Sequence, residues 1–142
     1  MTPVRNIDID RVLPQQPPFR FVDRLEAFGE EGARVSFTPG SGNLLMEEDC
    51  LSASGLLEHM AQANAARVGY LNVYILHLPL KIGFIGQVRN YVIHRLPRSG
   101  ERLDTLVQLR YEMFGVSLCD VTVCSGQEVL ATASLKTAIK DD

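Results

Sequence analysis

The sequence of 142 residues contains no tryptophan and has few cysteines and histidines. Its three cysteines are odd in number and show no CxxC spacing, which argues against a zinc site or a disulfide framework and favours reduced thiols. The three histidines are dispersed and lack the spacing of metal ligands, so we expect no metal and no cofactor. These residues are Cys50, Cys119, Cys124, His59, His77 and His94.

Long apolar runs are also absent. No stretch approaches the roughly 20 residues that cross a bilayer. Acidic residues stand in segment 1–10, where a secretory signal would have its apolar centre. We therefore expect a cytoplasmic protein without a membrane partner.

The charge distribution weighs against nucleic-acid binding, because the net charge is −3 and no basic motif is present. The segment from Lys81 to Arg102 nevertheless carries five basic residues and only one acidic residue. Two interpretations stay open for it: a solvated strand face, or a docking rim for an acidic or phosphorylated partner.

The residues that are present predict one globular domain over 1–142, with an average hydrophobic fraction of 46%. Spacing predicts a helical turn at 8–13, one long helix over 51–71, and alternating strands. The fold class is therefore α+β, with one central helix and a curved, mostly antiparallel sheet whose edge invites dimerisation. The expected strands are 19–25, 33–38, 81–95, 102–114, 117–124 and 128–139.

The long helix carries the most informative residue, Glu58, between Leu57 and Met60. A lone carboxylate avoids burial, so Glu58 lies either at an exposed edge or where its pKa is raised for proton chemistry. Ser52 or Ser54 is expected to cap the helix. The predicted apolar stripe consists of Leu57, Met60, Ala61, Asn64, Val68 and Leu71.

Three motifs occur in an order that resembles the 3-hydroxyacyl-acyl-carrier-protein dehydratases. LPQQPPFRFVDR (13–24) resembles their LPHRxPFLLVDR opening, and LEHMAQ (57–62) resembles their LEAMAQ helix motif. GFIG (83–86) with PRSGERL (97–103) resembles FxGxxxxRF followed by PGDxL. The resemblance implies the hotdog fold, in which a curved sheet wraps a long helix and two subunits normally build an acyl tunnel.

By this resemblance, Glu58 matches the catalytic carboxylate, and Gln62, one helical turn on, is expected to orient it. The family's partner histidine should lie near Leu44, but the loop 42–50 has none, and the histidine of the opening motif is replaced by Gln15. The family's oxyanion glycine falls at Ala53.

The same resemblance names the residues expected to contact substrate. Backbone amides around the family's oxyanion position are expected to polarise the thioester carbonyl. His59 points about 100° away from Glu58 around the helix, so we expect it at a subunit interface or on the surface. The expected substrate-binding residues are Ala53, Ser54, Gly55 and Gly86.

Three functional hypotheses follow. The first is a 3-hydroxyacyl thioester dehydratase of fatty-acid or polyene-type lipid biosynthesis, with Glu58 as acid and base. The second is an acyl-CoA or acyl-carrier thioesterase, which uses one carboxylate and water. The third is a non-catalytic acyl-binding subunit whose companion supplies the histidine. In each case the partner is an acyl thioester on acyl carrier protein or CoA, and the assembly is a homodimer or higher oligomer, with a heterodimer as the alternative.

Overall fold

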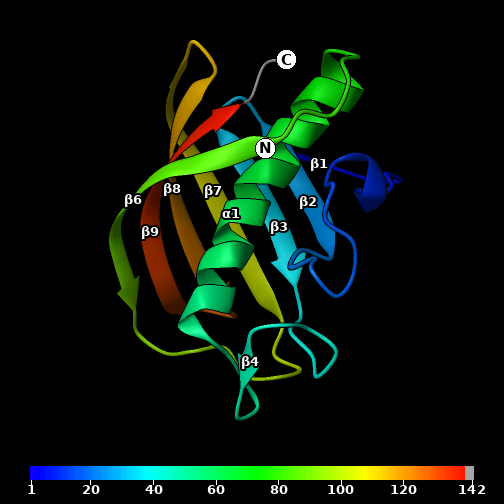
Figure 1. Cartoon of the computed structure of the whole chain (residues 1–142). Coiled ribbons are helices and arrows are strands. Elements are labelled where there is room, and N and C mark those ends of the chain that lie inside the picture. The colour runs from blue at the N-terminus through cyan, green and yellow to red at the C-terminus, as the bar shows by residue number, and fades with distance from the viewer. Residues whose placement is uncertain (140–142) are drawn as a thin grey trace.

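The computed structural model describes residues 1–139 and shows one long helix packed against an antiparallel sheet (Figure 1). The sheet has seven strands in the order β1-β2-β3-β7-β8-β9-β6. Two short strands form a hairpin just before the helix. The strands are β1 (Thr2–Pro3), β2 (Arg24–Gly29), β3 (Gly32–Phe37), β4 (Met46–Glu47), β5 (Cys50–Leu51), β6 (Gly83–Ile93), β7 (Leu103–Met113), β8 (Val116–Ser125) and β9 (Glu128–Ile139).

This arrangement confirms the α+β prediction and five of the expected strands, β3 and β6 to β9, to within two residues at each end. β6 to β9 form where the sequence alternates, and the hairpin between β2 and β3 turns between Gly29 and Gly32. The predicted turn near residue 10 is the 3-10 helix η1 (Ile9–Arg11). Residues 140–142, the end of the expected domain, lie outside the described residues. Within the described part, no helix is long and apolar enough to span a membrane.

The helix α1 (Ala53–Tyr70) begins at a side-chain cap and continues into a π-helical turn, η2 (Leu71–Ile75). Ser52 Oγ accepts a hydrogen bond from Gly55 N at 3.1 Å, which confirms the first of the two expected caps. The predicted apolar stripe is only partly buried, because Leu57 and Ala61 are half-exposed. The most deeply buried face of α1 instead contains Leu56, His59 and Ala63. The predicted stripe is rotated around the helix from this face, toward the side that lines the cavity described below.

The expected strand over 19–25 is wrong, since β2 starts at Arg24. The side chain of Gln62 takes the backbone groups that would enter a sheet ladder: its Oε1 accepts from Phe21 N at 2.7 Å, and its Nε2 donates to Phe19 O at 2.9 Å. His59 contacts Phe21 O at 2.6 Å. Because side chains of α1 make the hydrogen bonds of these backbone N–H and C=O groups, residues 19–21 lie against α1 instead of pairing with a strand.

The segment before residue 19 also lies against the helix, at a glycine that permits close approach. A Cβ added at Gly69 would stand 2.1 Å from Val12 O, so no other residue fits there without displacing the chain. Val12 and Leu13 are fully buried at this contact. The result is a segment held over the helix face, where it forms one wall of a cavity.

Candidate functional site

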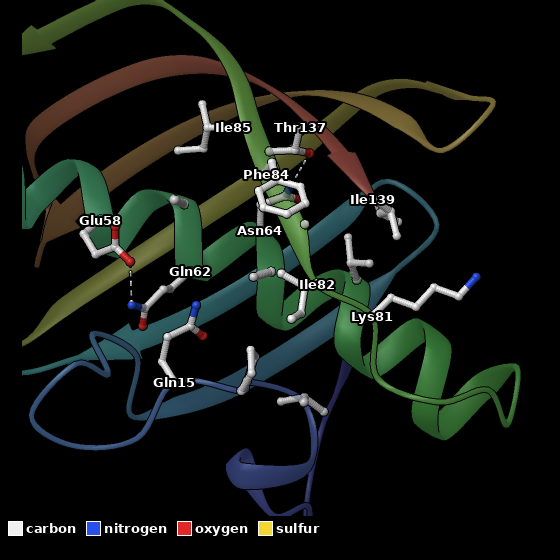
Figure 2. A pocket seen from close by; sticks show the side chains of 16 residues that line it. Gln15, Glu58, Gln62, Asn64, Lys81, Ile82, Phe84, Ile85, Thr137 and Ile139 are labelled. Atoms are coloured by element: carbon white, nitrogen blue, oxygen red, sulfur yellow. Dashed lines mark hydrogen bonds between the residues drawn. The ribbon is translucent and has the colours of Figure 1, made fainter. Parts of the chain in front are cut away.

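A cavity of about 330 Å³ lies beside α1. Figure 2 shows its walls: the helix on one side, the start of β6 and the end of β9 on another, and the segment around Gln15 on a third. Along α1 the lining residues run from Glu58 to Val68. Ten residues of helix rise about 15 Å, which is enough length to accommodate an extended acyl chain. Ile82, Phe84 and Ile85 make the opposite wall apolar.

Glu58 and Gln62 line this cavity together. Gln62 Nε2 donates to Glu58 Oε1 at 2.9 Å, as the dashed line in Figure 2 shows. Gln62 is buried, its Nε2 also donates to Phe19 O, and its Oε1 accepts from Phe21 N. Both N–H groups and the oxygen of its amide are therefore in hydrogen bonds. Its position is therefore fixed, and it fixes Glu58 Oε1 in turn. Among residues 1–139, Gln62 is the only side chain recorded as donating to this carboxylate.

His59 is neither at the surface nor at an open face, and that expectation is wrong. Its Nδ1 lies 2.6 Å from Phe21 O, so Nδ1 carries the proton, and its Nε2 accepts from Thr105 Oγ1 at 2.7 Å. The ring stacks on Phe37 with centroids 5.3 Å apart. Burial lowers the pKa of His59 to about 4, because the charged form would lose its hydration. His59 is thus a neutral core residue.

The other residues expected to contact substrate lie outside the cavity wall. Ala53 and Ser54 are exposed at the first turn of α1, with Ser54 one turn before Glu58 on the same face. Gly55 is buried, and its N–H is used by the Ser52 cap. Gly86 does not line the cavity and instead borders a separate depression with Lys136. Of the expected site residues, the structure brings together Glu58 and Gln62.

Three comparisons place this geometry among known proteins. A family model described as ApeP dehydratase, ApeP-like, matches residues 7–142. The chain belongs to the ApeP-like family. No match was found among curated proteins.

Several solved structures share the fold of this chain. The dehydratase heterocomplex ApeI:P from Xenorhabdus doucetiae aligns with a TM-score of 0.88 and 19% identity, covering 97% of this chain and 94% of the other. The PaaI protein of the E. coli phenylacetic acid degradation operon aligns with a TM-score of 0.63 and 16% identity, covering 80% of each chain. A hypothetical thioesterase with coenzyme A from Streptococcus pneumoniae TIGR4 aligns at 0.65 and 11% identity, covering 84% and 86%. The fold is the expected hotdog fold.

All three histidines of this ApeP-like protein lie among the described residues, and none of them lines the cavity. His59 is occupied in the core, and the residues that line the cavity include neither His77, which lies in the loop after η2, nor His94, which follows β6. The loop before the helix, which contains Leu44, does not line the cavity either. Glu58 is therefore the cavity's carboxylate without a histidine from its own chain.

Sequence reasoning missed a polar network beneath the cavity of this ApeP-like protein. Asn64 Nδ2 donates to Thr137 Oγ1 at 3.0 Å, and both residues line the cavity (Figure 2). Asn64 Oδ1 accepts from Nε of the buried Arg67 at 2.9 Å. Asn64 had been included in the apolar stripe, and an asparagine three residues before an arginine in an otherwise apolar helix was the available signal.

Proposed function

We propose that this ApeP-like protein is a subunit of a 3-hydroxyacyl thioester dehydratase in which Glu58 is the general acid and base. The observation that carries the proposal is the Glu58–Gln62 hydrogen bond in the wall of an apolar cavity. The acyl chain would lie along α1 toward Val68, with C2 and C3 beside Glu58. Membership of a dehydratase family supports this choice of reaction.

In the proposed reaction, Glu58 Oε2 accepts the proton from C2. The electron pair of the C2–H bond forms the C2–C3 double bond as the C3–O bond breaks. The departing hydroxyl takes that proton from Glu58 Oε2 and leaves as water, which returns Glu58 to its carboxylate form. Gln62 acts as a positioning residue, since it holds Oε1 and leaves Oε2 for the substrate. The first-turn amides of Ala53 and Ser54 are the proposed donors to the thioester carbonyl.

A second subunit is part of this proposal. The cavity is lined by the start of β6, which lies at an edge of the sheet and pairs only with β9 within the described residues. Phe84 and Ile85 on this strand are 54% and 38% exposed. A partner chain along β6 would cover them and close the cavity, and it would be the source of the histidine that this chain lacks. The likeness to a dehydratase heterocomplex supports a heterodimer with a companion chain.

The test is product analysis with a 3-hydroxyacyl thioester on acyl carrier protein and on CoA, by intact mass and chromatography. We expect enoyl thioester from the protein, formed slowly where no companion chain supplies a histidine, and a further loss of about 10²–10⁴-fold in Glu58→Gln, the range that one acid–base group contributes. Glu30→Gln, at an exposed hairpin turn, is the matched control and should keep full activity. Equal turnover by Glu58→Gln would reject the assignment.

A thioesterase is the second candidate, and one observation favours it: Glu58 lies in the cavity without a histidine from its own chain. A single carboxylate can activate a water, so this function does not need the missing group. The same assay separates the two functions, because a thioesterase releases free thiol and free acid. Unchanged substrate in every sample would support the non-catalytic subunit instead.

A further inference from the structure

The polar groups in the cavity wall differ in how many of their hydrogen bonds are already made. Gln62 uses both of its N–H groups and its oxygen within the protein. Asn64 donates to Thr137 and accepts from Arg67. The Gln62 amide is therefore unavailable to a ligand unless an existing bond breaks, whereas Asn64 keeps one N–H that makes no hydrogen bond among the described residues. The oxygens of both amides already accept hydrogen bonds, so a ligand that brings a donor into the cavity needs another acceptor.

Gln15 offers an acceptor besides Glu58 Oε2, to which the proposed reaction assigns the C2 proton. It lines the same cavity, and its Oε1 is buried without a hydrogen-bond partner among the described residues. Buried side-chain acceptors are nearly always satisfied in native proteins, so each exception calls for a ligand, a water or another explanation. An acceptor oxygen in a cavity wall selects for a ligand that brings an O–H or N–H group there.

The position of Gln15 is fixed by the fold. Arg20 Nε donates to Gln15 O at 3.0 Å, and Arg20 also pairs with Asp10. The neighbouring residue, Phe19, is bonded to Gln62, which holds Glu58. A continuous set of bonds therefore connects the backbone that carries Gln15 to the carboxylate. Gln15 and Glu58 line the same cavity from different segments of the chain.

We propose that Gln15 Oε1 accepts a hydrogen bond from the C3 hydroxyl of a 3-hydroxyacyl thioester and is a specificity-determining residue. The inference rests on the proposed function for its class of ligand. Within the acyl part of such a substrate, the C3 hydroxyl is the only hydrogen-bond donor, and a saturated or enoyl chain has none. The amide N–H groups of a pantetheine arm are the other source of a donor, and the experiment separates the two.

The experiment measures equilibrium binding without turnover. The two probes are alkyl pantetheine thioethers that differ only in a hydroxyl at C3. Neither has a carbonyl at C1, so neither can be dehydrated or hydrolysed. We expect the hydroxylated probe to bind the unaltered protein about tenfold more tightly, the effect of satisfying one buried acceptor. In Gln15→Met, which has a similar shape but no acceptor, the two dissociation constants should become equal.

Two further variants complete the design. Gln15→Glu keeps an acceptor oxygen and should keep the preference, while Gln127→Met, at the exposed turn between β8 and β9, should behave as the unaltered protein does. Equal affinities in the unaltered protein overturn the inference without any variant. If Gln15→Met weakens the binding of both probes equally, the inference is overturned and Gln15 Oε1 binds a pantetheine amide instead. If Gln15→Met changes neither dissociation constant, the inference is overturned and Gln15 Oε1 binds a water.

These outcomes are independent of catalysis. A hydroxyl preference that depends on Gln15, without enoyl formation, would reject the proposed reaction and keep this residue's role. Enoyl formation without the hydroxyl preference would keep the proposed reaction and reject the role of Gln15. Absence of binding by either probe would reject the acyl-thioester site itself, and this inference with it.

Discussion

Acidification should destabilise this protein through His59. The residue is fully buried and neutral, and burial lowers its pKa from 6.5 to about 4. A proton added to Nε2 would displace the hydroxyl hydrogen of Thr105 and place a charge in the core. Because the unfolded state binds this proton more readily, the contribution of neutral His59 is complete above pH 6.5 and is lost as the pH falls from 6.5 toward 4.

The size of the effect follows from the two pKa values. At 1.36 kcal/mol per pKa unit, the full difference corresponds to about 3 kcal/mol, and about 2 kcal/mol of it is already lost at pH 5. This is a large part of the 5–15 kcal/mol that is typical of the stability of a domain. The contact with Phe21 O would weaken at the same time, although the same backbone is also held by Gln62.

The assay is urea unfolding at pH 7.5 and pH 5.0, with the unaltered protein and with His59→Gln. Glutamine donates and accepts hydrogen bonds but does not titrate, so the variant should be less stable at both values and less sensitive to pH. His77, His94 and the carboxylates are common to both proteins, and their contributions cancel in the difference. The unaltered protein should lose about 2 kcal/mol more than the variant. Equal losses in the two proteins would refute the reasoning.

Two further substitutions test how the site is held. Gln62→Met keeps the volume but removes three hydrogen bonds, so both the free energy of unfolding, by about 1–3 kcal/mol, and the turnover should fall. The control Gln108→Met, exposed on β7, should change neither quantity. Unaltered turnover in a folded Gln62→Met protein would contradict the positioning role of Gln62. Gly69→Ala places a methyl group against Val12 O and should lower the free energy of unfolding, measured by heat or urea, by about 1–3 kcal/mol. The control Gly42→Ala, in open space, should lower it much less. Equal effects of the two substitutions would contradict the close approach of Gly69 to Val12.

The parts of this structure that the sequence predicts are those with local causes. β7 and β9 alternate apolar and polar residues because one face of each strand is buried, and α1 begins at Ser52 because a hydroxyl can cap the helix. The motif around Glu58 was recognisable because it lies within six consecutive residues. Such patterns are visible without knowledge of the fold.

The failures have long-range causes. Residues 19–21 alternate as a strand does, but Gln62 and His59, about forty residues away, take their backbone hydrogen bonds. The sequence alone favours a subunit interface or the surface for His59, because its partner Thr105 lies in a distant strand. Gln15 had no signal of its own beyond its position in the opening motif, since its significance depends on the cavity that the folded chain forms around it.

Proton transfer at C2 by Glu58 is the central claim, and hydrogen exchange tests it most directly. The protein is incubated with a 3-hydroxyacyl thioester in D2O, and deuterium at C2 is measured by mass spectrometry and NMR. Reversible removal of the C2 proton incorporates deuterium even where departure of the hydroxyl is slow for want of a histidine. The account predicts incorporation by the unaltered protein and by Glu30→Gln, and its loss in Glu58→Gln. Incorporation that is equal in Glu58→Gln, or absent from the unaltered protein, would contradict it.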